Sequence, residues 1–194
     1  MPRITRDSLL TLEAYAKARP EFRVRVMQHK ADRRVALGGH VTLQFEDELT
    51  IRYQVQEMLR IERIFEEAGI QHELDAYNPL IPDGTNLKAT MMLEYPDAEE
   101  RGRALARLKG IEDAVWLRVR DGPKIHAVAD EDLERENEEK TSSVHFLRFE
   151  LGAQARQDLI SGARLALGVD HPEYRAESDP VAESVRVSLA RDLL

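Results

Sequence analysis

Hydrophobic and polar residues alternate along several short stretches of the chain, and this period of two is typical of half-buried β-strands. The alternation is clearest over residues 87–95, where the odd positions are apolar and the even positions are mostly polar. Two further apolar runs flank the Gly38-Gly39 turn and predict a β-hairpin over residues 33–45. The same reasoning predicts strands over residues 114–119, 124–128, 143–151 and 164–170.

Apolar residues spaced three and four positions apart predict helices between these strands. We expect helices over residues 7–18, 20–32, 48–68, 70–78, 97–109, 153–161 and 180–194. Because strands occur both in hairpins and between helices, the pattern predicts the α+β class, with a mixed, largely antiparallel sheet covered by helices. No linker rich in proline, glycine or serine divides the chain, so we expect a single domain over residues 1–194.

The distribution of charge indicates one segment that does not belong to a predicted helix or strand. The 194 residues include 36 acidic and 28 basic side chains, which give a net charge of −8. Seven of the acids lie within residues 130–140, where apolar residues are almost absent. Such a segment has little to bury, so we expect a flexible acidic segment near residues 130–142.

Composition and missing motifs exclude several classes of protein. The negative net charge disfavours nucleic acid and anionic membranes as partners, and no apolar run approaches the ~18 residues of a membrane span. The chain has no cysteine, which removes disulfides, thiolate ligands and thiol catalysis. It also lacks a phosphate-binding glycine loop, a dinucleotide fingerprint, a nucleophile elbow and a zinc-protease motif. We expect a cytoplasmic protein that binds neither nucleic acid nor membrane, and a homo-oligomer remains open.

The predicted helix over residues 48–68 carries the first candidate site residues. Its apolar side chains cover most of the circumference, and Glu62 lies near the centre of this apolar arc, with Glu57 also inside it. A buried carboxylate has to be paired, protonated or bound to a metal, because an isolated charge in the interior costs several kcal/mol. The sequence leaves two interpretations of Glu62: an ion pair with an arginine such as Arg148, or a metal or acid–base carboxylate.

Two histidines extend the apolar faces of predicted strands. His145 begins the apolar face of its strand, and His171 ends the apolar face of its own. If these strands pair antiparallel, the two imidazoles meet at one end of the same face; otherwise they are ordinary buried histidines with backbone hydrogen bonds. Glu57, Glu62, His145 and His171 form the predicted metal set, for a divalent ion such as iron, manganese or zinc.

Three stretches of the chain follow the pattern of a known family. They are Phe45-Glu46-Asp47 with Thr50, Tyr53, Gln54, Glu57, Met58, Arg60, Glu62, Arg63 and Ile64; residues 73–82; and residues 144–149. Over nearly its full length the chain resembles an uncharacterised bacterial family known only as domain of unknown function three-five-zero-one. The resemblance implies genes beside those of a rubrerythrin-like di-iron protein and an iron–sulfur oxidoreductase. It therefore implies a cytoplasmic role near iron or peroxide, with those proteins as partners, and it brings no assigned active site.

Two hypotheses of function result. The first is a non-catalytic accessory or binding protein that works with iron or redox proteins under peroxide or metal stress. The second is a metal-dependent enzyme that uses the carboxylate/histidine cluster of Glu57, Glu62, His145 and His171. The metal content of protein purified without a histidine tag separates them, because near-stoichiometric metal favours the second.

Overall fold

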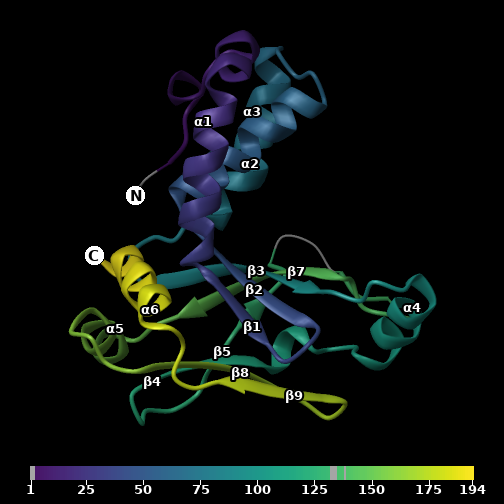
Figure 1. Ribbon diagram of the computed structural model, residues 1–194, viewed down its shortest axis with the longest axis vertical. Helices are drawn as coiled ribbons and strands as arrows, with labels where there is room; N and C mark the ends of the chain where they lie inside the picture. Colours follow the sequence, from purple (N-terminus) through teal and green to yellow (C-terminus); the bar gives the residue numbers. More distant parts are fainter. Residues whose placement is uncertain (1–2, 132–134, 138) are drawn as a thin grey trace.

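Two antiparallel β-sheets packed face to face form the body of the molecule. This computed structural model describes residues 3–131, 135–137 and 139–194. One sheet has five strands, in the order β1 (Arg34–Leu37), β2 (Val41–Glu46), β3 (Asn86–Leu93), β7 (Val144–Glu150) and β6 (Val128–Ala129). The other has four, in the order β5 (Ile125–His126), β4 (Val115–Val119), β8 (Leu165–His171) and β9 (Tyr174–Ser178). Figure 1 shows the two sheets as stacked layers.

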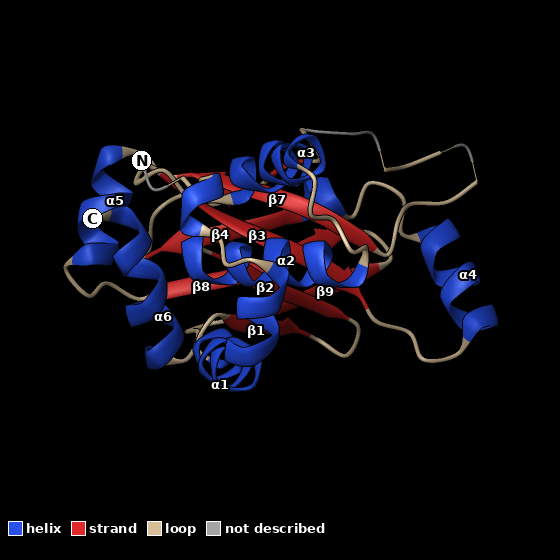
Figure 2. Cartoon of the chain, turned by 90° about the horizontal axis from the view of Figure 1, so that it is seen from above, coloured by secondary structure: helices blue, strands red, loops and turns tan. Residues whose placement is uncertain are grey.

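The helices lie above and beside the sheets. An arm that rises from the five-stranded sheet consists of α1 (Leu12–Ala31), α2 (Glu48–Ile61) and α3 (Glu67–Tyr77) (Figure 1). At one end of the sheets lies α4 (Ala98–Arg107), and at the other lie α5 (Ala153–Ile160) and α6 (Glu183–Ala190) (Figure 2). Short 3-10 turns are η1 (Arg6–Ser8), η2 (Asn78–Leu80), η3 (Glu112–Ala114) and η4 (Arg191–Leu193). None of the helices in the described ranges has the length and apolar content that a bilayer crossing requires.

Alternation along the strands sends every second side chain into the space between the sheets. The inner rungs of the five-stranded sheet are Leu43–Met91–His145 and Phe45–Ala89–Leu147, all buried. Each buried leucine or phenylalanine contributes roughly 1.5–3 kcal/mol, so this core holds the two sheets together. The arm has a smaller core of its own, made of Ile4, Leu9, Ile51, Val55, Leu59, Ile70, Leu74 and Ile81.

The α+β class is confirmed, but the strands form two sheets instead of one, and each described pair is antiparallel. The expected strand over 124–128 explains the division. Its first part, β5, pairs with β4, whereas Val128 begins β6 and pairs with β7 of the other sheet. The sequence pattern did not predict β9, whose side chains are mostly polar because it is an edge strand.

The helix expected over residues 48–68 is two helices. The first, α2, ends at Ile61, and Arg63 adopts a left-handed backbone conformation with φ of 56°. The Ile64 N–H then donates to the Leu59 carbonyl at 2.9 Å, and the chain reverses so that α3 packs against α2. This reversal lets Ile64 pack on the arm core, where a continued helix would carry it away. The expectation that Glu62 is buried is wrong, because it lies exposed at the end of α2.

The helices expected over residues 7–18 and 20–32 are one continuous helix, α1, that begins at Leu12. Pro20 lies inside it and has no N–H to donate to the Ala16 carbonyl. Because both residues are exposed, water can bond that carbonyl and the helix continues.

Candidate functional site

A cavity of about 310 Å³ lies between the outer face of the five-stranded sheet and the base of the arm. Strand pairing places its floor: Gln44 and Glu46 on β2, Thr90 and Met92 on β3, and Val144 and Phe146 on β7. The remaining walls come from the arm and the turn after it: Lys30, Ile51, Gln54, Tyr77 and Leu80. Its volume is in the range of small-molecule sites, and most of its lining is apolar with a few polar groups.

Glu46 is the unusual residue of this cavity. It is only 8% exposed, yet no described lysine, arginine or histidine forms an ion pair with it. Its Oε2 accepts a hydrogen bond of 2.5 Å from the Thr50 hydroxyl, and its Oε1 accepts one of 2.7 Å from the Thr90 hydroxyl. Each carboxylate oxygen has a second lone pair, so the group can accept further hydrogen bonds from a molecule in the cavity.

The three stretches that resemble the family pattern meet at this cavity. The first supplies Glu46 and Gln54, the second supplies Tyr77, and the third supplies Val144 and Phe146. Residues separated by about 100 positions in the chain thus line one space. None of the four predicted metal ligands, Glu57, Glu62, His145 and His171, lines this cavity.

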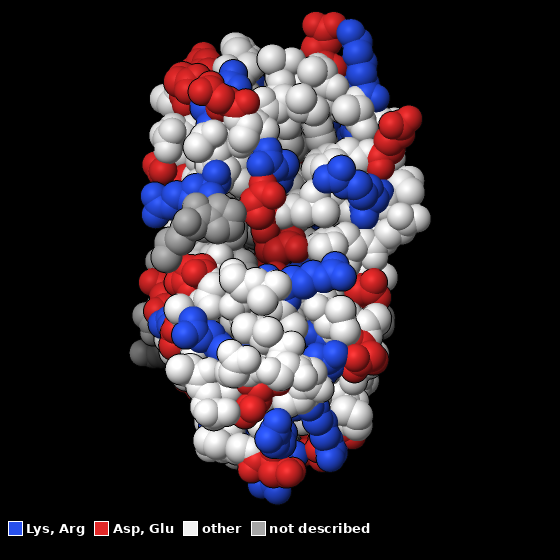
Figure 3. Space-filling view, turned by 90° about the vertical axis from the view of Figure 1, so that its left-hand side faces the viewer, with Lys and Arg blue, Asp and Glu red and all other residues white. Residues whose placement is uncertain are grey.

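A second hollow, of about 400 Å³, lies where the arm meets the C-terminal turn. Its lining is strongly charged and includes Asp47, Glu48, Asp83, Arg191 and Asp192. Figure 3 shows charged side chains of both signs in the region where the arm joins the sheets. Asp47 and Asp192 already share the buried Arg33 as their counter-charge, so this hollow has a structural explanation.

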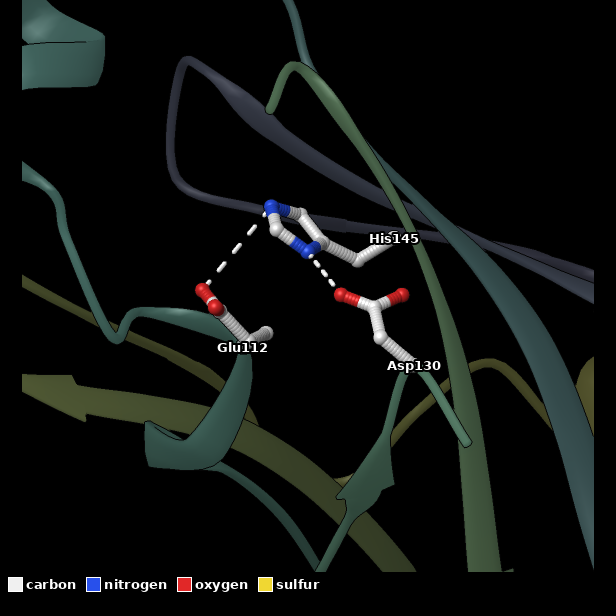
Figure 4. Close-up of side chains that lie close together, drawn as sticks. All are labelled: Glu112, Asp130 and His145. Atoms are coloured by element: carbon white, nitrogen blue, oxygen red, sulfur yellow. Dashed lines mark hydrogen bonds and ion pairs between the residues drawn. The ribbon is translucent and has the colours of Figure 1, made fainter. Parts of the chain in front are cut away.

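On the inner face of the same sheet, His145 is the centre of a buried polar cluster (Figure 4). Its Nδ1 lies 2.6 Å from Asp130 Oδ2, and its Nε2 lies 3.8 Å from Glu112 Oε2. The Thr141 hydroxyl oxygen and the Ser142 carbonyl each lie 3.1 Å from Nε2. Within the residues that the structure describes, Glu112, Asp130 and His145 are the group of histidine and carboxylate side chains close enough to share an ion.

The two carboxylates of this cluster, Glu112 and Asp130, have different surroundings. Burial raises the pKa of Glu112, and the nearby imidazole partly opposes that rise. Asp130 accepts a hydrogen bond of 2.9 Å from the Phe146 N–H, and Arg135 forms an ion pair with it at 3.1 Å. The first residue of the acidic segment is therefore anchored rather than solvated. Residues 132–134 and 138 of that segment lie outside the described residues, and its flexibility stays a prediction.

The four predicted metal ligands do not come together. Glu57 lies in the arm, where Arg19 donates to both of its oxygens at 2.7 and 2.9 Å. Tyr15 and Arg60 also donate to it, and these hydrogen bonds lower the pKa of Glu57 to about 2, with the Arg19 bond the largest cause. Glu62 is exposed at the end of α2. Both residues lie in the arm, apart from the histidines in the sheets.

The two histidines also lie apart, because β7 and β8 belong to different sheets. His171 Nε2 lies 2.9 Å from the Lys109 carbonyl, and its Nδ1 accepts the Glu173 N–H at 3.2 Å. It is thus a buried histidine with backbone partners. His145 instead meets Glu112 and Asp130, which the sequence analysis missed because no short spacing connects η3, β6 and β7.

The fold and the site define an α+β protein with two packed sheets, a helical arm, a cavity beneath that arm and a buried histidine–carboxylate cluster. The chain belongs to the family described as Protein of unknown function (DUF3501), whose pattern matches residues 3–193. It is 57% identical to a novel protein of unknown function from Burkholderia pseudomallei K96243, known from a crystal structure. The two superpose with a TM-score of 0.94 over 99% of this chain and 100% of the other. No curated protein matches the chain.

Proposed function

We propose that the protein is a non-catalytic binding protein whose ligand is a small organic molecule with a cationic group and an apolar body. The observation that supports this is Glu46, a buried carboxylate without a described counter-charge that lines an open cavity. Burying an unpaired carboxylate is costly, so a site that keeps one is suited to a ligand that neutralises it.

The cavity lining suits such a ligand around Glu46 and along its apolar wall. An ammonium or guanidinium group would donate to the free lone pairs of Glu46 while the hydroxyls of Thr50 and Thr90 hold the carboxylate in place. The apolar body would pack on Leu80, Met92 and Phe146. The described lining contains no serine, cysteine or histidine, so the proposal is binding rather than catalysis.

The wider role is an accessory one in the cytoplasm, beside iron or redox proteins during peroxide or metal stress. This part rests on the family resemblance, with a rubrerythrin-like protein or an iron–sulfur oxidoreductase as the partner. A pull-down with each purified partner, in the presence and absence of the cavity ligand, tests it. If neither partner is retained, with or without the cavity ligand, the accessory role is contradicted.

Calorimetric titration with 2-phenylethylammonium and its neutral analogue 2-phenylethanol tests the cavity. We expect the ammonium compound to bind and the alcohol to bind at least tenfold more weakly, because only the former neutralises Glu46. Glu46→Gln should remove this preference. The matched control is Glu94→Gln, since Glu94 is exposed and lies outside the cavity lining. Equal binding of both compounds, or binding unchanged in Glu46→Gln, would refute the proposal.

The second candidate, a metal-dependent enzyme, keeps His145 but not the other predicted ligands. The side chains around His145 are almost entirely buried, with His145 itself 0% exposed. An ion held there would stabilise the sheets rather than meet a substrate.

A further inference from the structure

We propose that His145, Glu112 and Thr141 form a binding site for one divalent transition-metal ion, with Asp130 orienting the imidazole. The site lies between the two sheets, apart from the cavity under the arm, and does not depend on the function proposed for that cavity. Glu112 belongs to η3, whereas Thr141 lies in the segment before β7 and His145 is the second residue of β7. An ion there would connect the segment that leads into one sheet with a strand of the other.

The distances between the three ligand atoms fit a metal ion. His145 Nε2 and Thr141 Oγ1 are 3.1 Å apart, Thr141 Oγ1 and Glu112 Oε2 are 3.4 Å apart, and Nε2 and Oε2 are 3.8 Å apart. A circle through three points with these separations has a radius of about 2.0 Å, which is the length of a zinc bond to nitrogen or oxygen. One point in that plane is therefore at bonding distance from all three atoms without any movement of the side chains.

A fourth candidate ligand atom, an oxygen of the main chain, is close to the same nitrogen. The Ser142 carbonyl lies 3.1 Å from Nε2, as far as the Thr141 hydroxyl does. Two ligands with bonds of about 2.1–2.2 Å lie about this far apart when they are neighbours in an octahedral shell. The carbonyl is thus near enough to Nε2 to bind the same ion as a neighbouring ligand.

Asp130 supplies the support that metal-binding histidines usually have. Its Oδ2 lies 2.6 Å from Nδ1, whereas Glu112 faces the other ring nitrogen, Nε2 (Figure 4). A carboxylate there keeps the proton on Nδ1 and leaves the lone pair of Nε2 for the metal. The carboxylate is itself fixed by the Phe146 N–H and by Arg135.

The ligand types select the ion. One imidazole, one carboxylate and neutral oxygens suit first-row divalent metals such as manganese, iron and zinc, whereas an all-oxygen shell would suit calcium or magnesium. Without an ion the Thr141 hydroxyl, which lies within hydrogen-bond distance of both Nε2 and Glu112 Oε2, can donate to the Nε2 lone pair in place of the metal. The alternative to a metal site is therefore a purely hydrogen-bonded cluster, and the experiment has to distinguish the two.

Titration of tag-free, chelator-treated full-length protein with Co²⁺ and with Mn²⁺ distinguishes them. We expect one equivalent of each to bind, seen as visible absorption bands for cobalt and as loss of the free-ion electron paramagnetic resonance signal for manganese. His145→Gln and Glu112→Gln should abolish or weaken binding at least tenfold, and Asp130→Asn should weaken it by about 10–100-fold. The matched control is His171→Gln, because His171 is also buried but, among the described residues, forms its hydrogen bonds with backbone groups.

A comparison at Thr141 keeps the test valid if the charged-residue variants fail to fold. Thr141→Ser retains the hydroxyl and should bind both ions as the wild type does, whereas Thr141→Val should weaken binding while remaining folded by circular dichroism. Absence of stoichiometric binding in the wild type would establish a hydrogen-bonded cluster and overturn the proposal. Equal binding in the wild type and in His145→Gln would also overturn it, since the ion would then lie elsewhere.

Discussion

Replacing Glu57 by glutamine should destabilise the arm of the molecule. The Glu57 carboxylate connects α2 to α1 by accepting two hydrogen bonds from Arg19 and one of 2.7 Å from Tyr15. Arg60 of α2 donates to it as well. Glutamine keeps the volume but removes the charge and half of the acceptor capacity, so Arg19 loses its counter-ion.

The expected loss is about 2 kcal/mol at pH 7. The pKa of Glu57 falls from 4.5 to about 2 on folding, and at 1.36 kcal/mol per pKa unit this corresponds to about 3 kcal/mol. The side chain of Glu57 is 12% exposed, but those of Arg19 and Arg60 are 32% and 38% exposed, so water screens part of this gain. A lowered folded-state pKa stabilises the protein above pH 4.5, and the gain disappears as the pH falls towards 2.

Urea unfolding followed by circular dichroism at pH 7 and pH 3 measures this effect. The difference between wild type and Glu57→Gln should shrink by more than half at pH 3. Fluorescence of Trp116, the single tryptophan, reports the sheets and shows whether the arm unfolds separately. The control is Glu13→Gln, because Glu13 is an exposed acid of α1 that pairs with the exposed Lys17, and its replacement should change the free energy of unfolding by less than about 0.5 kcal/mol at both pH values. A variant as stable as the wild type at pH 7, or an equal loss at both pH values, would refute the reasoning.

Three further substitutions test the fold. Glu62→Gln should change the free energy of unfolding by less than about 0.5 kcal/mol, because Glu62 is exposed. A loss of several kcal/mol in urea unfolding would show instead that Glu62 is buried. Gly168→Ala should cost about 1–3 kcal/mol, since its Cβ would lie 2.3 Å from a ring atom of Trp116; an unchanged melting temperature would show that the ring can move. Arg33→Met should cost about 3–5 kcal/mol in urea unfolding because it leaves the buried Asp192 unpaired; a smaller loss would mean that Asp192 is protonated there.

Local patterns predicted the elements whose structure depends on neighbours in the chain. The hairpin at Gly38-Gly39 forms as expected, with β1 and β2 on either side. The alternation over residues 87–95 is that of β3, and the pattern at residues 143–151 is that of β7. In each case one face of the strand is apolar because it lies between the sheets, which is the condition that produces a period of two.

Elements that depend on distant contacts were not predictable in this way. The end of α2 at Ile61 follows from the packing of α3 against α2, although the apolar spacing continues beyond it. The division of residues 124–128 between two sheets follows from the position of β7, which the local sequence does not encode. Glu112 and Asp130 meet His145 for the same reason. The alternation along β7 predicted that His145 faces the interior, as it does, but its partners come from pairing over long distances.

Strand β7 has side chains in both the cavity and the buried cluster. His145 points inward to Glu112 and Asp130, while its neighbours Val144 and Phe146 point outward into the cavity. A shift of the strand by one residue would exchange the two faces and put the imidazole in the cavity and an aromatic ring in the core. An insertion or deletion in this strand would therefore remove both sites together, so neither can be lost or remodelled by a change of register while the other is retained.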